Sequence, residues 1–107
     1  MSTRLELLKR YLQEDPSDSF LRYALALEFI SLNHQEQAYK QLEKLLSDEP
    51  DYLAAYYMAG KTAETLGQKT IAINWYTRGI EIARLQNNQH TMNELSEALN
   101  QTDEKDE

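Results

Sequence analysis

Side chains that could do chemistry are few in this sequence and stand far apart. It contains two histidines, His34 and His90, and no cysteine. A zinc site needs three or four ligands, and neither histidine has a third candidate ligand close by in the sequence. Glu28 or Glu64 could act as a general base, but no nucleophile or oxyanion-stabilising group accompanies either carboxylate. We therefore predict no metal, no cofactor and no enzymatic activity.

The glycines do not form a phosphate-binding loop, because three scattered glycines cannot build one. Two of them, Gly60 and Gly67, enclose the segment GKTAETLG, and the flanking residues have a helical pattern. A glycine inside a helix costs about 1 kcal/mol relative to alanine. Each of these glycines therefore requires a structural reason.

Composition narrows the class of protein further. The 107 residues are 41% hydrophobic and 27% charged, which is ordinary for one globular domain. The sequence has no apolar run long enough to cross a membrane and no apolar signal segment near its start. Residues 94–107 carry −5 of the net charge of −7, and no basic face is visible. We predict a cytoplasmic protein that binds neither nucleic acid nor a membrane.

The chain repeats itself at a fixed interval. Pro16 and Pro50 stand 34 positions apart, and each follows a pair of acidic residues. Apolar residues recur in the same register three times over, as Leu5/Tyr39/Ile73, Leu8/Leu42/Tyr76 and Leu12/Leu46/Ile80. A fixed period of this length is typical of stacked helical hairpins, none of which buries its apolar face alone.

Apolar spacing and helix breakers together predict six helices. Their approximate bounds are 3–14, a Ser17 or Asp18 cap to 32, 35–47, an Asp51 cap to 66, 69–85 and 90–99. We expect a single domain over residues 1–101 and a disordered acidic tail over 102–107. The domain divides into a leading half-repeat helix (1–15), a first repeat (16–49), a second repeat (50–83), and the end of the last helix plus a terminal capping helix (84–101).

The glycines now have an interpretation within this repeat. Gly67 stands one full period after Asn33, and these two residue types most readily adopt the left-handed conformation that ends a helix. Gly60 stands one full period after Ala26. We expect both small residues, and Gly79 similarly, to let the partner helix approach to about 8 Å between axes.

These residues resemble the tetratricopeptide repeat family, whose pattern is W-x2-L-G-x2-Y…A-x3-F…P at a 34-residue period. The second repeat carries at these positions Tyr56, Ala59, Gly60, Ala63, Ala72 and Tyr76. The first repeat carries Arg22, Leu25, Ala26, Phe29, Ala38, Leu42 and Pro50. No tryptophan opens either repeat, Ala63 replaces the aromatic residue, and Arg84 stands at the third proline position. The resemblance covers about residues 5–83.

The resemblance implies an all-α, right-handed superhelix (solenoid) of antiparallel helix hairpins, with a concave groove that binds proteins or peptides and does no chemistry. Some family members clamp a peptide carboxylate with lysine and asparagine side chains on the groove. The lysine position falls on Tyr23 here, and the asparagine positions fall on Leu27 and Met58. None of the three matches, so we do not expect a clamp of that kind.

In this arrangement the groove would be lined by residues from the first helix of each hairpin. The predicted partner-binding residues are Phe20, Tyr23, Leu27, Ile30, Tyr57, Lys61 and Glu64. The helix over 20–32 carries a second apolar stripe, Leu21/Leu25/Phe29/Leu32, that can pack on neighbouring helices. The stripe Phe20/Tyr23/Leu27/Ile30 must also be covered, either by a neighbouring helix, by a bound peptide or by another copy of the chain.

Two functions remain open. The first is a non-catalytic adaptor that binds a protein or peptide in the apolar and aromatic groove. The second is a structural homo-oligomer in which the same stripe forms the subunit interface. An enzyme or an RNA-binding repeat fits less well, because the body of the chain is nearly neutral and lacks a catalytic constellation. Trp75 is expected to pack against the fold rather than to serve as an exposed anchor.

Overall fold

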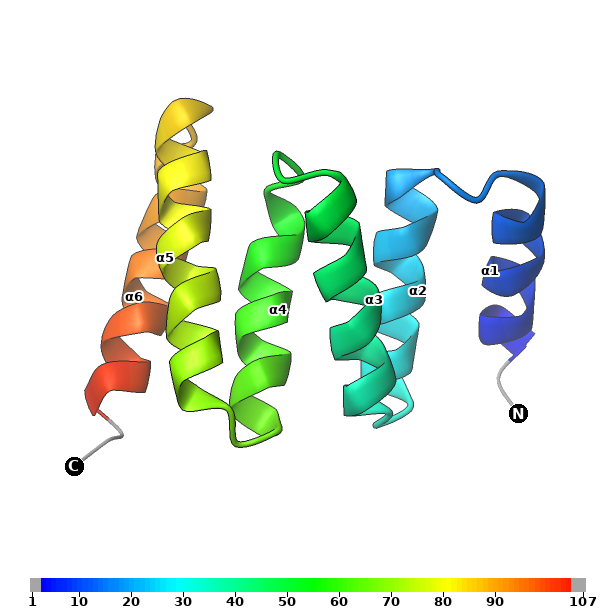
Figure 1. Cartoon of the computed structure of the whole chain (residues 1–107), viewed down its shortest axis with the longest axis horizontal. Helices are drawn as coiled ribbons and strands as arrows, with labels where there is room; N and C mark the ends of the chain where they lie inside the picture. The colour runs from blue at the N-terminus through cyan, green and yellow to red at the C-terminus, as the bar shows by residue number, and fades with distance from the viewer. Residues whose placement is uncertain (1–2, 105–107) are drawn as a thin grey trace. The chain divides into compact units, whose positions relative to one another are not determined.

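The computed structural model describes residues 3–104, which form six α-helices and no β-strand (Figure 1). The helices are α1 Thr3–Glu14, α2 Ser19–Ser31, α3 Gln35–Asp48, α4 Ala54–Thr65, α5 Lys69–Leu85 and α6 Gln89–Glu104. The predicted all-α fold is confirmed. In the described part of the chain, no helix is both long enough and apolar enough to cross a membrane.

The chain divides into two compact units, Met1–Tyr52 and Leu53–Glu107. The N-terminal unit holds α1 to α3 and the C-terminal unit holds α4 to α6. Each unit is described by itself below. The expected single domain over 1–101, with repeats at 16–49 and 50–83, stays a prediction.

The helix ends follow local residue chemistry. Asp18 is the N-cap of α2, and its carboxylate accepts a hydrogen bond from the Leu21 amide at 2.8 Å. Asn33 and Gly67 have φ angles of 63° and 77°, so the predicted left-handed helix ends are confirmed. Asn87, after α5, adopts the same conformation with φ 56°.

The predicted cap of α4 by Asp51 is wrong. Asp51 lies in a turn that is closed by a hydrogen bond from the Tyr52 amide to the Glu49 carbonyl at 3.1 Å. Helix α4 begins only at Ala54, after this turn. Leu53 occupies the N-cap position without a side-chain hydrogen bond.

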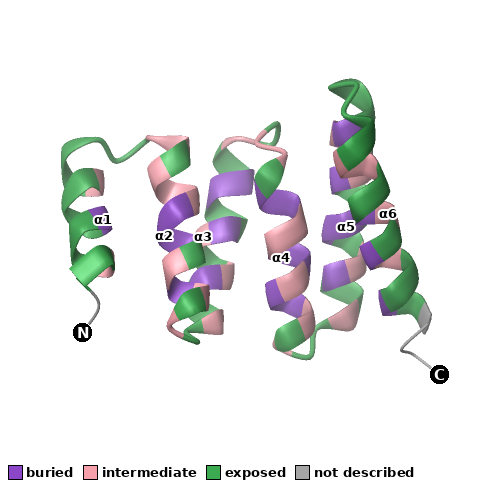
Figure 2. Ribbon diagram, turned by 180° about the vertical axis from the view of Figure 1, so that it is seen from behind, coloured by how far each residue is buried: buried purple, intermediate pink, exposed green. Residues whose placement is uncertain are grey.

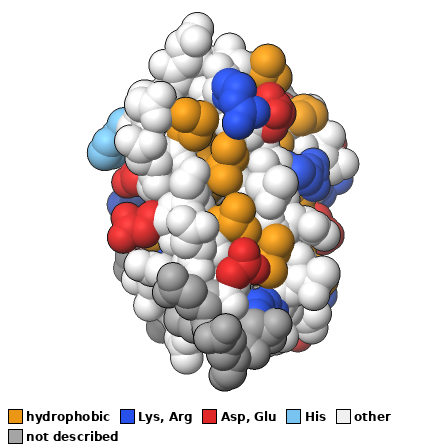
Figure 3. Space-filling view, turned by 90° about the vertical axis from the view of Figure 1, so that its left-hand side faces the viewer, with side chains coloured by type: hydrophobic (Ala, Val, Ile, Leu, Met, Phe, Trp, Pro, Cys, Tyr) orange, Lys and Arg blue, Asp and Glu red, His pale blue; other side chains and the backbone are white. Residues whose placement is uncertain are grey.

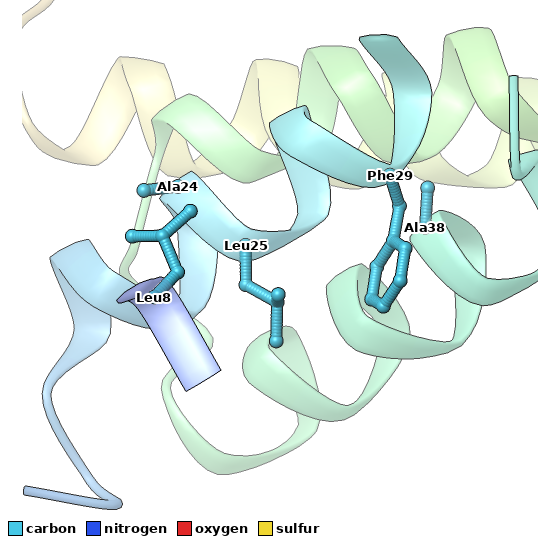
Figure 4. Close-up of a cluster of buried hydrophobic side chains, with 5 residues drawn as sticks. All are labelled: Leu8, Ala24, Leu25, Phe29 and Ala38. Atoms are coloured by element: carbon cyan, nitrogen blue, oxygen red, sulfur yellow. The ribbon is translucent and has the colours of Figure 1, made fainter. Parts of the chain in front are cut away.

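The core of the N-terminal unit is aliphatic, with one aromatic ring. One cluster of its buried side chains draws on all three helices and consists of Leu8, Ala24, Leu25, Phe29 and Ala38 (Figure 4). Leu5, Leu12, Leu21 and Ile30 pack against this cluster and are partly buried. The apolar repeat residues of α1 (Leu5, Leu8 and Leu12) and the second apolar stripe of α2 therefore both contribute to the core.

The core of the C-terminal unit is built on aromatic rings and close helix approach. Tyr56, Tyr76 and Leu95 are fully buried there. A Cβ atom on Gly60 would overlap the ring of Tyr76, and one on Gly79 would lie 2.7 Å from Cβ of Tyr56. The predicted close contact at Gly60 is confirmed. Figure 2 shows the buried residues of α4 and α5 recurring along each helix.

The terminal helix is longer than expected. We predicted that it would end near Leu99 and that residues 102–107 would form a tail, but α6 continues to Glu104. Thr102 is buried, and its hydroxyl faces the Ala98 carbonyl at 2.8 Å and the Glu64 carboxylate. The contact with Glu64 of α4 holds the last turn of α6 against the unit. Residues 105–107 of the predicted tail lie outside the described residues.

Candidate functional site

The predicted α2 stripe, Phe20/Tyr23/Leu27/Ile30, divides into an exposed pair and a half-buried pair. Phe20 is 69% exposed and Leu27 is 37% exposed. Tyr23 and Ile30 are half-buried, and Ile30 packs against the core cluster of the N-terminal unit. The N-terminal unit therefore covers only part of the stripe. Phe20 and Leu27 form the accessible part.

The half-buried Tyr23 packs against another tyrosine. Its ring centroid lies 5.7 Å from that of Tyr52, with the ring planes tilted by 55°. Burial and then the neighbouring Tyr52 raise the pKa of Tyr23, and burial, Asp18 and Glu49 raise the pKa of Tyr52. Both phenols are therefore neutral at physiological pH. The pair offers two ring surfaces on the same unit as Phe20, with hydroxyl groups that can donate hydrogen bonds.

Polar side chains on other sides of α2 are used within the N-terminal unit. Glu28 forms an ion pair with Arg4 on α1, with Nε and Oε1 3.2 Å apart. Ser19 donates a hydrogen bond to the Glu49 carboxylate, and Arg22 Nη2 lies 2.9 Å from Oδ2 of Asp48. These contacts fix the rotation of α2 about its axis. They determine which residues of the helix remain accessible.

The three predicted residues of α4 are linked by charge contacts. Lys61 Nζ lies 5.4 Å from the ring centroid of Tyr57 and 3.7 Å from Oε2 of Glu64. Oε2 of Glu64 also accepts a hydrogen bond from the Tyr76 hydroxyl at 2.8 Å. The Glu64 carboxylate therefore has a structural role that sequence reasoning missed: it joins α4 to α5 and, through Thr102, to α6.

The environment of Tyr76 explains why it stays uncharged. Burial, and then the hydrogen bond and charge of Glu64, raise the pKa of Tyr76 far above its usual range. The phenol therefore keeps its proton and donates it in a hydrogen bond to Glu64 at every physiological pH.

A small cavity adjoins Tyr57 in the C-terminal unit. It measures about 230 Å³ and is lined by Tyr57, Glu94, Glu97, Ala98 and Gln101. Helix α6, which we expected to be only a terminal cap, thus provides one wall of a concave surface together with α4. The apolar residues Met92, Leu95 and Leu99 were the signal in the sequence. They turn their own side of α6 toward the core and leave the opposite side for this surface.

Apolar side chains also reach the surface of the C-terminal unit. Leu85 is 71% exposed, and Ile71 is exposed as well. Seen from the end that carries α5 and α6, hydrophobic side chains form a band flanked by acidic and basic groups (Figure 3). Trp75 does not belong to the accessible surface, because it is buried as expected.

The histidines stand in separate environments. His34 lies beside the ring of Phe29, with centroids 6.2 Å apart, and His90 Nε2 lies 3.5 Å from a carboxylate oxygen of Glu94. Over residues 3–104, no three histidine or acidic side chains come together in a way that could hold a metal ion.

Comparison with known proteins identifies the family. The profile of the tetratricopeptide repeat matches residues 53–84. A tetratricopeptide repeat domain protein from Salinibacter ruber, solved by NMR, is 38% identical to this chain, and the alignment covers 81% of this chain and 88% of that one with a TM-score of 0.77. The chain belongs to the tetratricopeptide repeat family.

Two more distant structures share the fold. A protein from Bordetella parapertussis is 24% identical, with a TM-score of 0.85 and coverage of 99% of this chain and 92% of that one. PcrH, crystallised with the chaperone-binding region of PopD, is 14% identical, with a TM-score of 0.88 and coverage of 96% and 78%. A search of curated proteins found no significant match.

Proposed function

We propose that this protein is a non-catalytic adaptor that binds a segment of another protein through the α2 stripe. The observation that carries the proposal is Phe20, a large aromatic side chain that is 69% exposed on a helix whose charged groups are already paired. Leu27, two turns further along α2, extends the apolar surface. The predicted residues of the C-terminal unit, Tyr57 and Lys61, would offer an aromatic face and a positive charge.

Binding energetics support Phe20 as the anchor. Complete burial of an exposed phenylalanine contributes about 1.5–3 kcal/mol. Interface residues with large effects are typically aromatic and surrounded by contacts that exclude water. The half-buried rings of Tyr23 and Tyr52 would provide such a rim, since their phenols stay neutral. The expected partner is an apolar segment rather than a charged one.

The family and its relatives agree with this type of function. Stacked helical hairpins create extended concave surfaces that these proteins use for binding. PcrH has the same fold and was crystallised with a binding region of another protein, PopD. The present chain would act in a comparable way, on a partner that its own exposed residues select.

A second function is favoured by the distribution of exposed apolar residues in the N-terminal unit. Leu7 and Tyr11 on α1 are exposed, as are Phe20 and Leu27 on α2. This much apolar surface on one small unit suits self-association through a second copy of the chain. Light scattering from micromolar to hundreds of micromolar concentration distinguishes the two functions, because a strict monomer excludes the homo-oligomer.

The binding function can be tested with peptides selected from a random displayed library on the full-length protein. Their affinities are then measured by calorimetry. Replacing Phe20→Ala and Leu27→Ala together should weaken binding at least tenfold, which corresponds to about 1.4 kcal/mol. Alanine keeps the helical propensity of α2, and unchanged circular dichroism would verify that.

The matched control is Leu85→Ala, which removes an exposed leucine from α5 and should leave the affinities unchanged. If the selected peptides bind the double variant as tightly as the original protein, the α2 stripe is not the binding surface.

A further inference from the structure

The N-terminal unit contains a cavity that is distinct from the α2 stripe. It measures about 360 Å³ and lies between the end of α1, the loop that follows it, and the second half of α3. Its lining residues are Leu12, Pro16, Ser17, Arg22, Gln41, Lys44 and Asp48, and we call it the Arg22 socket. Arg22 follows Phe20 by two residues, which is about 200° around the helix. The socket and Phe20 therefore occupy different sides of α2.

The repeat register shows what occupies the corresponding positions in the C-terminal unit. A shift of one full period takes Arg22 to Tyr56, Gln41 to Trp75 and Lys44 to Arg78. The rings of Tyr56 and Trp75 lie 6.0 Å apart there. The Arg78 guanidinium lies 4.5 Å from the Trp75 ring and 5.9 Å from the Tyr56 ring. The second repeat thus fills these positions with two aromatic rings beside a cation.

The first repeat retains cations at this place but has no ring. Lys44 stands at the register position of Arg78, while Arg22 and Gln41 replace the two aromatic residues. The Arg22 side chain is only 11% exposed, and its Nη2 lies 2.9 Å from a carboxylate oxygen of Asp48. A planar guanidinium held in one orientation is a suitable surface for stacking on a ring.

We propose that the Arg22 socket binds an aromatic side chain supplied by a partner protein. The incoming ring would contact the apolar side chains of Leu12 and Pro16 and stack beside Arg22 and Lys44, as Trp75 does beside Arg78. The volume of about 360 Å³ accommodates an indole or phenol ring. This site goes beyond the proposed function, because it shares no residue with the α2 stripe.

Charge favours a ring over an oxyanion in this socket. Asp48 already balances the charge of Arg22, and residues 1–52 carry ten acidic and six basic side chains. An anion would therefore approach against the net charge of its surroundings. A ring gains from the cation and from the apolar walls without bringing a negative charge.

The test is an NMR titration of the full-length ¹⁵N-labelled protein with N-acetyl-tryptophanamide. We expect saturable shifts of the amides of Ser17, Arg22 and Lys44, with a millimolar dissociation constant. N-acetyl-leucinamide and sodium acetate at the same concentration and ionic strength serve as aliphatic and anionic probes. The proposal is overturned if the tryptophan probe gives no saturable shift at the socket, or if either other probe shifts the same amides as strongly.

Variants of the socket test whether the tryptophan probe binds there. Gln41→Trp introduces the residue that the second repeat has, so it should fill the socket and abolish the titration. Lys44→Gln, at an exposed position, should weaken binding about twofold to fivefold. Lys40→Gln, on the same helix but outside the socket, is the matched control and should bind normally. If probe affinity survives both Gln41→Trp and Lys44→Gln, the ring binds elsewhere and the proposal fails.

Discussion

The two units are built on the same repeat register but fill it with different chemistry. In the C-terminal unit, Tyr56 and Trp75 pack as buried rings beside Arg78. In the N-terminal unit, an Arg22–Asp48 ion pair stands beside an open cavity. A helical hairpin accommodates either set of side chains, because its turns and its closely packed positions determine the backbone conformation. The departures from the family pattern are therefore the best guide to what is particular to this protein.

The units also differ in how they treat small residues. Gly60 makes room for the Tyr76 ring, while the corresponding Ala26 is buried in a unit whose core is mainly aliphatic. A large ring in the second core requires a smaller residue opposite it. The N-terminal unit instead leaves Phe20 and Leu27 exposed. Among the described residues, the N-terminal unit thus exposes more large apolar side chains than the C-terminal unit.

The largest effect is expected from removing the ring that distinguishes the C-terminal unit. Trp75→Ala should lower the free energy of unfolding by about 3–5 kcal/mol, because it leaves a cavity beside Tyr56 and Arg78. At the corresponding position, Gln41→Ala should change it by less than about 0.5 kcal/mol. Urea unfolding followed by circular dichroism measures both. Equal losses of unfolding free energy in Trp75→Ala and Gln41→Ala would contradict the difference between the two units.

A smaller loss is expected where the C-terminal unit needs glycine. Gly60→Ala should destabilise by about 1–3 kcal/mol, because the added methyl group overlaps the fully buried ring of Tyr76. Helical propensity alone would predict a gain of about 1 kcal/mol. The reciprocal change Ala26→Gly should cost about 1 kcal/mol through propensity. A Gly60→Ala variant that is more stable than the original protein would mean that Tyr76 moves aside freely.

The stability contributed by Tyr76 and by Tyr23 should depend differently on pH in alkaline solution. The pKa of Tyr76 is raised on folding, so the unfolded state releases its proton first as the pH rises above about 10. Stability contributed by this phenol is complete below about pH 10 and is lost above it. Tyr76→Phe should cost about 1.5 kcal/mol at pH 8, because the bond to Glu64 is charge-assisted. That cost should shrink above about pH 10.

Tyr23→Phe provides the comparison in the N-terminal unit. Its pKa is raised by burial and by Tyr52, without a carboxylate that accepts its proton. Its cost at pH 8 should therefore be smaller than that of Tyr76→Phe. Urea unfolding at pH 8 and pH 11 measures both variants. A Tyr76→Phe cost that is constant over this range would contradict the role of Glu64.

The smallest effects are expected at the helix ends, where the units are most alike. Gly67→Ala should cost about 1 kcal/mol from the left-handed conformation alone, since an added Cβ meets no atom within 4 Å. Asn33→Gly should stabilise by a few tenths of a kcal/mol for the same reason. Thermal unfolding of both variants measures the difference. A destabilising Asn33→Gly would indicate that the asparagine side chain has a role beyond its conformation.

Local signals predicted the helices well and their long-range contacts poorly. The bounds of α1 and α5 agree with the predicted ranges, because apolar spacing and a turn residue mark each end. The Asp51 cap was wrong, since the turn at Pro50 is closed by backbone groups that no side-chain pattern reveals. At the candidate site, the sequence left open what covers Phe20, and it gave no sign of the structural role of Glu64.

The sequence by itself determined the family, the period and the places where the chain turns. These features depend on residue types within a single repeat. A residue and its counterpart one period away therefore meet the same structural requirement. Only the tertiary structure decided which polar groups meet across helices. The Thr102–Glu64 and Arg22–Asp48 contacts join residues 38 and 26 positions apart. Helix packing brings such pairs together, and neither residue type nor spacing specifies the match.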